Sequence, residues 1–519
     1  MAPLKILWAD DEIEMLKPHI IFLEQKGYEV SSVSNGEDAV ESVRNEDYDL
    51  VLLDEMMPGK GGLAALTEIR EFNPSVPIIM VTKNEEEMLM EEALGQKITD
   101  YLTKPVNPSQ ILMACKKIFD SRKIEQDRLT RDYSKEFLSI SQAIEGNIVP
   151  EDWIETFLKL TEWELELDRF PELGFQGTVN ELHRDANRSF GRYMENVYRE
   201  WVNSENRPPM SVDIFPERVF PKVEQGRKAV FILIDCMRID QWITIEPLLY
   251  DYFKISRDYY FSILPTATPY SRNAIFSGYF PGEIEQNVPD LWQKTEEDEH
   301  SSNRFEHQFL EALIKRTFRD RKLTTRYIKI LDMKESQSTL KNISSLIQSD
   351  ILCIVVNFVD ILGHQRSESE ILREIAPDEA AYRSLIKSWF EHSDLLSILR
   401  KLAGRDVTVF ITTDHGSIRG KHPAKVIGDR ETSTSLRYKF GRNLKCDPKH
   451  VFHIREPADY RLPLRGINTQ YILAKEDYYL IYPNDFNRYA AMYKDCFHHG
   501  GISLDEVILP FITLEGLQK

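Results

Sequence analysis

The 519-residue sequence lacks an apolar run long enough to cross a bilayer, and its five cysteines include no Cys-x-x-Cys pair. The longest strongly apolar stretch, 351–359, is far shorter than the roughly 20 residues of a membrane helix. The cysteines are odd in number and scattered, which argues against a disulfide framework and a thiolate zinc site. We therefore expect a cytoplasmic protein without signal peptide or membrane association, in which histidines and carboxylates hold any metal ion.

Basic residues are also in deficit. The chain has 65 Lys and Arg against 84 Asp and Glu, a formal net charge of -19. Residues 1–120 hold much of this excess, with 11 basic and 23 acidic side chains. Such a surface disfavours non-specific nucleic-acid binding. Residues 121–205 show neither the short turn signal nor the basic helix of a helix-turn-helix module, so we expect no sequence-specific DNA binding.

Residues 1–120 alternate short apolar runs with helical patterns. The runs lie at 4–10, 28–33, 49–55, 76–82 and 100–105, and the helical patterns lie near 12–26, 36–45, 61–71, 85–95 and 108–120. Repeated β then α units predict a (βα)5 domain with a parallel sheet covered on both faces. Functional groups of such sheets gather at the carboxyl ends of the strands.

Acidic residues stand at these strand ends. Asp10 and Asp11 follow the first run, Asp54 ends the third, Thr82 ends the fourth and Lys104 follows the fifth. Three converging carboxylates repel one another unless a cation neutralises them, and an all-oxygen set selects Mg²⁺. Singly, each acid fits a helix cap or a solvated loop. Together they predict a metal-assisted phosphoryl-acceptor site.

The motifs D-D at 10–11, D-x-x-x-P at 54–58, Thr82 and Lys104-Pro105 resemble the receiver domain of bacterial two-component response regulators. The resemblance implies that Asp54 attacks the phosphohistidine of a sensor histidine kinase and forms an acyl phosphate. Receivers usually carry a small residue where this chain has Lys83, a departure that bears on access to Asp54.

The same resemblance implies the supporting roles in this domain. Mg²⁺ would be held by Asp10, Asp11, Asp54 and the backbone carbonyl of Met56. Thr82 would sense the phosphoryl group and Lys104 would pair with it. Tyr101 matches the aromatic switch of receivers.

Residues 121–205 carry recurring apolar positions without strand signals, punctuated by Pro150, Pro171, Gly174 and Gly177. The pattern predicts a bundle of three helices. Its aromatic residues are most simply core, with a self-association face as the alternative. Pro208-Pro209 then marks a linker.

The carboxy-terminal part has three apolar strands that end in acids. The strands cover 228–235, 352–360 and 406–414, and the acids are Asp235, Asp360 and Asp414. Thr268 precedes Pro269, which predicts Thr268 as the N-cap of a helix whose positive end attracts phosphate.

Histidines accompany these acids. His364 follows Asp360 by four residues, His415 follows Asp414 directly, and His498 and His499 lie near the end. Mixed imidazole and carboxylate ligands favour zinc, and two zinc ions suit phosphoryl transfer. Singly, these residues fit structural hydrogen-bonding roles. Arg238, Arg272 and Lys421 are candidate phosphate contacts on chemical grounds alone.

Several motifs over about 225–519 are similar to the PglZ branch of the alkaline phosphatase superfamily. They are D-x-x-R at 235–238, P-T-x-T-P at 265–269, D-x-x-G-H at 360–364, D-H-G at 414–416 and H-G-G-x-S-x-x-E at 499–506. The resemblance implies one zinc on Asp360, His364 and His499, and another on Asp235, Asp414 and His415 facing the nucleophile Thr268. His499 is preferred to His498 because it directly precedes two glycines.

The whole layout resembles the PorX-like response regulators. We expect a multidomain α/β protein with a receiver domain at 1–120, a three-helix bundle linker at 121–205 and an α/β PglZ domain at 206–519. The resemblance implies a zinc-dependent phosphodiesterase or phosphatase, acting on oligonucleotides or cyclic nucleotides and tied to type IX secretion and gliding. The alternative is a phosphorylation-switched scaffold that binds a sigma factor or secretion component without catalysis. A phosphorylation-dependent homodimer is expected in either case.

Overall fold

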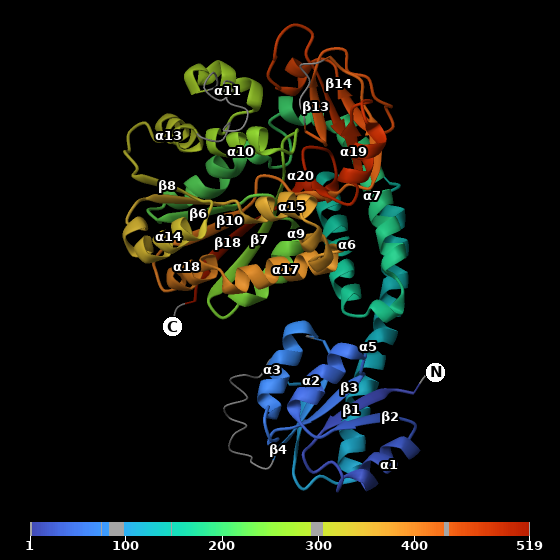
Figure 1. Cartoon of the computed structure of the whole chain (residues 1–519). Coiled ribbons are helices and arrows are strands. Elements are labelled where there is room, and N and C mark those ends of the chain that lie inside the picture. Colours follow the sequence, from blue (N-terminus) through green and yellow to red (C-terminus); the bar gives the residue numbers. More distant parts are fainter. Residues whose placement is uncertain are drawn as a thin grey trace. The chain divides into compact units, whose positions relative to one another are not determined.

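The computed structural model describes residues 3–73, 75–82, 98–146, 148–291, 305–429 and 435–517. The expected helix near 85–95 and Lys83 lie outside these residues. The chain divides into two compact units, Met1–Lys135 and Glu136–Lys519, and Figure 1 labels many of their helices and strands. None of the described helices combines the length and the apolar composition that crossing a bilayer requires.

The first unit contains a five-stranded parallel sheet with strand order β2-β1-β3-β4-β5. The strands are β1 (Lys5–Ala9), β2 (Glu29–Val33), β3 (Leu50–Asp54), β4 (Ile78–Thr82) and β5 (Asp100–Thr103), and the helices are α1 (Lys17–Gln25), α2 (Gly36–Asn45), α3 (Gly62–Phe72) and α5 (Pro108–Ala143). Alternate β1 side chains enter different cores, Leu7 one and Trp8 the other, because helices cover both faces of the sheet. The expected receiver fold is confirmed.

Two helix boundaries differ from the sequence expectation. Helix α1 begins at Lys17 rather than near residue 12, because residues 11–16 form turns that start where Asp10 accepts a hydrogen bond from the Glu12 amide at 2.9 Å. Helix α5 does not end near 120 but runs for 36 residues to Ala143. The first helix of the expected bundle is therefore the continuation of the last receiver helix.

The other two linker helices are α6 (Pro150–Asp168) and α7 (Gln176–Asn203). Their aromatic residues do not form a core of their own. Trp153 and Phe190 belong to the same buried cluster as Phe261 and Tyr270 of the following domain. Two helices with apolar faces bury those faces against whatever large apolar surface is near, and here that surface belongs to the second sheet domain.

The second unit is built on a six-stranded sheet with strand order β7-β18-β10-β6-β9-β8. The strands are β6 (Ala229–Ile234), β7 (Phe253–Phe261), β8 (Thr325–Ile330), β9 (Ile351–Val356), β10 (Thr408–Thr412) and β18 (Ile508–Gly516). Strands β10, β6, β9 and β8 run parallel, whereas β18 is antiparallel to both β10 and β7. The carboxyl ends of β6, β9 and β10 therefore meet at one edge, as the sequence predicts.

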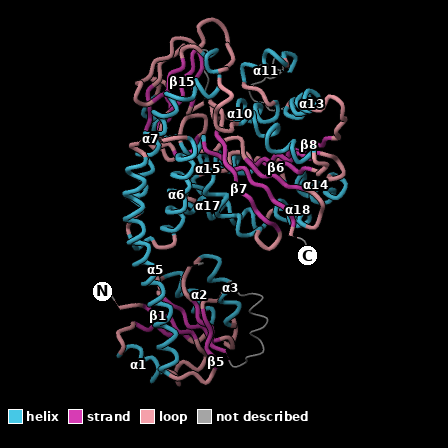
Figure 2. The backbone as a smooth tube through the Cα atoms, turned by 180° about the vertical axis from the view of Figure 1, so that it is seen from behind, coloured by secondary structure: helices cyan, strands magenta, loops and turns pink. Residues whose placement is uncertain are grey.

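Helices cover both faces of this sheet, as Figures 1 and 2 show. The helices of the chain after the linker are α8 (Phe220–Glu224), α9 (Ile239–Ile245), α10 (Thr268–Ser277), α11 (Pro281–Asn287), α13 (Glu306–Thr317), α14 (Met333–Leu346), α15 (Phe358–Glu368), α16 (Glu370–Ile375), α17 (Glu379–His392), α18 (Asp394–Ala403), α19 (Phe486–Tyr493) and α20 (Leu504–Val507). Neighbouring residues of β6 again alternate, since Phe231 packs with α10 and α13 and Ile232 packs with α14, α17 and α18. Because helices cover both faces of the sheet, every residue of β6 is buried.

Smaller sheets between β10 and β18 were not foreseen from the sequence. Their strands are β11 (Ile418–Arg419), β12 (His422–Lys425), β13 (Tyr438–Gly441), β14 (Val451–Ile454), β15 (Gln470–Ala474), β16 (Tyr478–Ile481) and β17 (Phe497–His498). Pairing of β11 with β17 places Ile418 opposite His498. That pairing carries the histidines of the last segment to the segment that follows Asp414.

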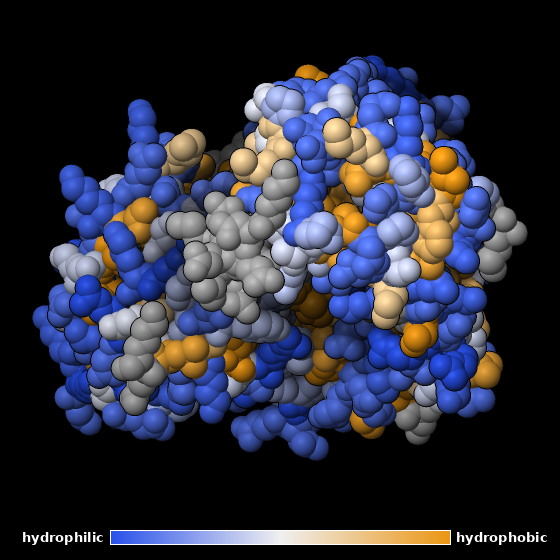
Figure 3. Space-filling view, turned by 90° about the horizontal axis from the view of Figure 1, so that it is seen from below, coloured by the Kyte–Doolittle hydropathy of each residue, from blue (hydrophilic) through white to orange (hydrophobic). Residues whose placement is uncertain are grey.

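The surface agrees with the charged composition. The face in Figure 3 is mainly hydrophilic, with hydrophobic residues in small groups.

Candidate metal centres

The first candidate site lies at the carboxyl edge of the receiver sheet. Asp10 follows β1 and Asp54 ends β3, and both are buried. Oxygen atoms of Asp10, Asp11 and Asp54 all lie within 4.8 Å of one another. The Lys104 Nζ, after β5, is 2.9 Å from Asp10 Oδ2 and 3.0 Å from Asp54 Oδ1. Two of the three carboxylates thus pair with one ammonium group.

The electrostatics of this site favour a further cation. Burial, with smaller contributions from Asp10 and Asp11, raises the pKa of Asp54 to about 6 although Lys104 opposes the shift. Burial lowers the pKa of Lys104, but its bonds to Asp10 and Asp54 outweigh that and raise it. The ammonium therefore stays charged, and an excess of oxygen donors remains that fits Mg²⁺.

The structure also places the other receiver residues. Thr82 ends β4, and its hydroxyl donates to Glu55. Tyr101 lies on β5 and is 44% exposed, and Met56 is 67% exposed two residues after Asp54. Thr82 is therefore at the strand end that the sequence indicates, beside the segment that follows Asp54.

The second candidate site begins with Asp235, Asp414 and His415. Asp235 directly follows β6 and Asp414 lies two residues beyond β10, and these strands pair in parallel with Thr412 opposite Leu233. All three side chains are buried, and their ligand atoms lie within 4.8 Å of one another. His415 Nε2 is 3.8 Å from Asp235 Oδ1 and 3.7 Å from Asp414 Oδ2.

A second group consists of Asp360, His364 and His499. The prediction that Asp360 ends a strand was wrong, because β9 stops at Val356 and α15 begins at Phe358. The four-residue spacing instead places Asp360 and His364 on one helix face. Asp360 Oδ1 lies 3.4 Å from His364 Nε2 and 3.6 Å from His499 Nε2. The two groups adjoin, since the His415 and His499 rings stack with centroids 4.2 Å apart.

The donor sets of these two groups suit a divalent cation. Among the described residues, the buried atoms Asp235 Oδ1, Asp414 Oδ1 and His499 Nδ1 have no hydrogen-bond partner. Burying a polar atom without a partner costs free energy unless an ion or a water molecule contacts it. Burial, followed by the nearby His415, lowers the pKa of His499 to about 3, so its imidazole is neutral and able to coordinate. Mixed imidazole and carboxylate ligands fit zinc.

His498 has a different environment from His499. It lies on β17, and its Nε2 is 3.1 Å from the Tyr493 carbonyl oxygen. It is not a member of either group of candidate ligands within the described part of the chain. The geometry therefore favours His499.

Thr268 stands at the start of α10, beside the first group. The structure corrects its predicted position by one residue: the N-cap is Ala267, which is extended, and Thr268 is the first helical residue. Pro269 fits the first turn, where no amide donor is needed. Thr268 Oγ1 is 3.0 Å from His415 Nε2, and His415 Nδ1 is 3.1 Å from the Gly416 carbonyl. With Nδ1 directed at that carbonyl, Nε2 is the ring nitrogen that faces Thr268, Asp235 and Asp414.

Arg272 is not available as a phosphate contact. Its side chain is fully buried, its Nη2 pairs with Asp235, its Nε donates to Asp414 Oδ2 at 2.9 Å, and its Nη1 is 3.5 Å from Glu306. Arg272 thus occupies Oδ2 of Asp235 and Oδ2 of Asp414 and leaves Oδ1 of each without a hydrogen-bond partner among the described residues. Sequence reasoning missed Glu306 entirely, because nothing in its local pattern links it to the site.

Arg238 and Lys421 also have other surroundings. Arg238 pairs with Asp240 at 2.7 Å and with Glu379 at 2.6 Å, so its guanidinium is engaged. Both residues line a separate pocket. Asn357, which sequence reasoning also missed, donates to Asp235 Oδ2 at 2.8 Å. Its place after β9, at the same sheet edge, was the signal that could have identified it.

Comparisons with known families cover all three parts of the chain. The model of the BREX system PglZ alkaline phosphatase-like domain matches residues 214–514. The response regulator receiver domain matches residues 6–116, and the PorX response regulator linker domain matches residues 123–202.

Curated relatives match the amino-terminal part. The transcriptional regulatory protein ResD of Bacillus subtilis (strain 168) is 35% identical over 112 residues, 22% of this chain and 46% of ResD. The alkaline phosphatase synthesis transcriptional regulatory protein PhoP of the same strain is 30% identical over 176 residues, 33% of this chain and 71% of PhoP. The chain thus spans about half the length of ResD.

Solved structures with similarity include two receivers. A CheY-like receiver domain protein from Methanospirillum hungatei JF-1 is 28% identical, covering 24% of this chain and 98% of that one with a TM-score of 0.23. The response regulator TrrA from Thermotoga maritima, in complex with Mg(2+)-BeF, is 30% identical over 22% of this chain and 98% of that one, with a TM-score of 0.21. With the PglZ match spanning more than half of its residues, the chain belongs to the PglZ alkaline phosphatase-like family and joins that domain to a response regulator receiver and a PorX linker domain, the PorX-like architecture.

Proposed function

We propose that the protein is a response regulator, phosphorylated on Asp54, whose output domain is a zinc-dependent phosphodiesterase or phosphatase with Thr268 as nucleophile. The observation that carries the proposal is the hydroxyl of Thr268 lying 3.0 Å from His415 Nε2, beside two adjoining groups of candidate metal ligands. A helix start, a hydroxyl and two cation sites at one sheet edge are the parts that phosphoryl transfer to a side chain needs.

Each residue has a chemical task in this proposal. The amino end of α10 would attract the phosphoryl oxygens, since the helix dipole is positive there. The Thr268 hydroxyl would lose its proton, and Oγ1 would bond to phosphorus as the bond to the ester oxygen breaks and that oxygen takes up a proton. Water would later break the bond between Oγ1 and phosphorus, which returns a proton to Thr268 and releases the phosphate product. Zinc on Asp360, His364 and His499 and on Asp235, Asp414 and His415 would supply Lewis-acid chemistry.

Arg272 has a supporting task. The buried guanidinium contacts Asp235 and Asp414 together, which orients both carboxylates. Burial raises the pKa of Asp235 well above its ordinary value although Arg272 opposes the shift, whereas at Asp414 burial is outweighed by the charges of Arg272 and His415, which lower the pKa. Arg272 and Asn357 occupy both contacts on Asp235 Oδ2, so Oδ1 faces the position where a cation would bind.

The receiver would control this site. Receiver domains are phosphorylated by sensor histidine kinases, and here Mg²⁺ would be held by Asp10, Asp11, Asp54 and the carbonyl of Met56. Thr82, Lys104 and Tyr101 would respond to the phosphoryl group. We assign the receiver to 1–120, the linker to 121–205 and the effector to 206–519, with α5 continuous through the first boundary. A helix shared by both parts is a direct physical link between signal and output.

Partners and substrate follow from the family resemblance. Phosphodiesters of oligonucleotides or cyclic nucleotides are the proposed substrates, and a sigma factor or type IX secretion component and a second copy of the chain are the proposed partners.

Hydrolysis of bis-p-nitrophenyl phosphate tests the enzymatic proposal. The Thr268→Ala variant should lose at least about 100-fold in kcat, since the nucleophile is absent. Thr317→Ala, at the far end of α13, should keep wild-type rates because its hydroxyl only bonds its own helix. A zinc-loaded protein with no turnover above the Thr268→Ala background, also with dinucleotides, would refute catalysis and leave the non-catalytic scaffold.

A further inference from the structure

Thr266 is the first threonine of the P-T-x-T-P segment, and it takes no part in the chemistry proposed for Thr268. Its side chain is fully buried. The Thr266 hydroxyl donates to the Gly501 carbonyl oxygen at 2.8 Å and accepts from the Gly500 amide at 3.1 Å. These partners lie 235 and 234 residues further along the sequence. One hydroxyl therefore joins the segment that carries Thr268 to the segment that carries His499.

The bond from Gly500 restrains His499. The Gly500 amide nitrogen belongs to the same planar peptide unit as the His499 carbonyl group, so holding this nitrogen restricts the backbone of His499. Gly500 has a φ of 115°, and a Cβ at this position would lie 2.5 Å from a ring carbon of Tyr438. A Cβ at Gly501 would lie 2.4 Å from the Ala474 carbonyl oxygen. The loop after His499 is thus so closely packed that glycine is required, and its polar backbone atoms need partners within the protein.

The contacts around the metal groups form a closed circuit. Thr268 Oγ1 is 3.0 Å from His415 Nε2, and the His415 ring stacks on the His499 ring with centroids 4.2 Å apart. The two residues that follow His499 bond the Thr266 hydroxyl, and two peptide bonds lead from Thr266 back to Thr268. Because each step of the circuit is a bond or a direct contact, the Thr266 hydroxyl restrains the spacing between Thr268 and His499.

The same loop has a second anchor. The Gly501 amide donates to Glu506 Oε1 at 2.8 Å. Glu506 is fully buried, and Arg437 binds both of its carboxylate oxygens, at 2.5 and 3.1 Å. This anchor should keep the loop folded after the loss of the threonine hydroxyl.

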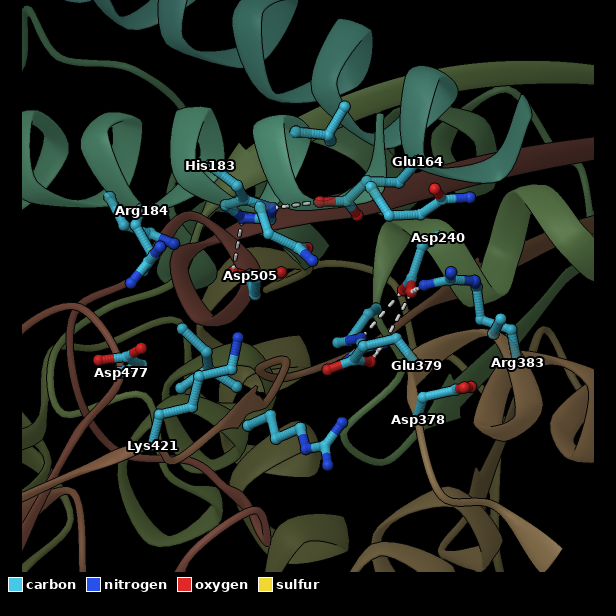
Figure 4. Close-up of a pocket in the computed structure, with 18 of the residues that line it drawn as sticks. Glu164, His183, Arg184, Asp240, Asp378, Glu379, Arg383, Lys421, Asp477 and Asp505 are labelled. Atoms are coloured by element: carbon cyan, nitrogen blue, oxygen red, sulfur yellow. Dashed lines mark hydrogen bonds and ion pairs between the residues drawn. The ribbon is translucent and has the colours of Figure 1, made fainter. Parts of the chain in front are cut away.

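Helix α20, which carries Glu506, is itself held by the linker helix α7. The Leu504 amide donates to Asn187 Oδ1 at 2.7 Å. In Figure 4, His183 lies between Asp505 and Glu164, at 3.1 and 2.5 Å. Burial lowers the pKa of His183, but the charges of the two carboxylates outweigh it and raise the pKa well above its ordinary value. The linker thus fixes the second anchor through contacts that do not include the threonine.

We propose that Thr266 is a positioning residue, whose hydroxyl holds His499 where it can share a cation with Asp360 and fixes that place relative to Thr268. His499 Nε2 is 3.6 Å from Asp360 Oδ1. The inference rests on the proposed zinc site of Asp360, His364 and His499. Valine in place of Thr266 has nearly the same shape but carries a methyl group instead of the hydroxyl, so two buried backbone groups lose their partner.

Zinc titration of the full-length, chelator-treated protein against a chromophoric chelator tests the proposal, and circular dichroism confirms that each variant is folded. Thr266→Val should bind one zinc equivalent about tenfold more weakly than the wild type, because residues that orient metal ligands have effects of this size. Thr266→Ala also lacks the hydroxyl and should behave like the valine variant. Thr266→Ser keeps the hydroxyl and should bind zinc like the wild type.

Thr161→Val is the matched control. This threonine is 1% exposed, and its hydroxyl donates to the Phe157 carbonyl oxygen of its own helix at 2.8 Å. The control should bind zinc like the wild type, because α6 contributes no candidate metal ligand among the described residues.

Hydrogen exchange of the metal-free proteins gives a readout that needs neither zinc nor catalysis. An amide of segment 497–503 should exchange about tenfold faster in Thr266→Val, since the Gly500 amide loses its acceptor. The serine variant and the Thr161→Val control should exchange there like the wild type.

A double variant shows whether Thr266 acts through His499. In a His499→Ala background, Thr266→Val should change zinc binding little, because the ligand that it positions is absent. The proposal is overturned if Thr266→Val binds zinc as tightly as the wild type, if serine does not restore binding, or if valine weakens binding equally with and without His499. A wild type that binds zinc but hydrolyses no phosphodiester would refute the enzymatic proposal alone, and the zinc titration would still decide the role of Thr266.

Discussion

Replacement of Arg272 by methionine is the sharpest test of how the effector site is held together. Methionine keeps an unbranched chain of similar reach but removes the charge. The guanidinium is fully buried among Asp235, Asp414 and Glu306, so the variant leaves three buried carboxylates without their shared cation. Tyr327, whose hydroxyl donates to Glu306, cannot replace that charge.

The expected cost is large for one residue. Removing one partner of a buried ion pair costs about 3–5 kcal/mol of unfolding free energy, because the remaining charge stays buried and unpaired. The control is Arg227→Met, which breaks a surface pair with Asp406 whose side chains are 46% and 90% exposed. Exposed pairs contribute about 0–1 kcal/mol, so this variant should unfold nearly like the wild type.

Urea unfolding of the metal-free proteins, followed by tryptophan fluorescence, measures both variants. Zinc should then recover part of the Arg272→Met loss, since it brings positive charge to the same carboxylates, and a ligand at 100 times its Kd adds about 2.7 kcal/mol. Equal unfolding midpoints for the two metal-free variants would refute the buried-cation argument. A zinc gain that Asp235→Asn retains in full would refute the shared use of those oxygens.

Three further outcomes are expected. Asp54→Asn should lose labelling by acetyl phosphate whereas Asp47→Asn, at an exposed position, should be labelled like the wild type; equal labelling of both variants would exclude Asp54 as acceptor. His183 has a raised pKa, so the stability it provides is complete below about pH 6.5 and is lost as pH rises through its folded-state pKa; the urea midpoint difference between wild type and His183→Asn should therefore shrink at alkaline pH, and a constant difference would contradict the paired imidazolium. Elemental analysis should find about one zinc fewer per chain in His364→Ala, while His392→Ala, on the exposed end of α17, should keep the wild-type content.

The local sequence pattern was sufficient to predict candidate site residues that lie at the ends of strands. In parallel sheets the carboxyl ends of neighbouring strands lie at one edge. Asp10 and Asp54 could therefore be assigned to one site, and Asp235 and Asp414 to another, before their distances were known. The four-residue spacing of Asp360 and His364 is typical of two side chains on one face of a helix. Asp360 was nevertheless predicted at the end of a strand, and it lies in helix α15. An apolar run followed by Asn357 does not by itself distinguish a strand that continues from one that has ended.

Long-range charge pairing was not predictable in the same way. Arg272, Arg238 and Lys421 are chemically suited to phosphate, and nothing local indicates which carboxylate each one meets. Arg272 meets Asp414, 142 residues away in sequence, and Arg238 meets Glu379, 141 residues away. Such pairs depend on how helices pack on the sheet, and packing depends on side-chain shape across the whole domain.

The sequence by itself determined which ligand types, carboxylates and imidazoles, could hold a metal ion, and it placed the acids at the ends of apolar strands. Those features are local, because periodicity and residue chemistry act over a few positions. Only the tertiary structure decided that the linker helices share a core with the effector, that β11–β17 pairing brings His499 against His415, and that buried arginines neutralise acids instead of binding substrate. Burial makes an unpaired charge costly, so buried arginines such as Arg272 and Arg238 lie against acids that are distant in the sequence.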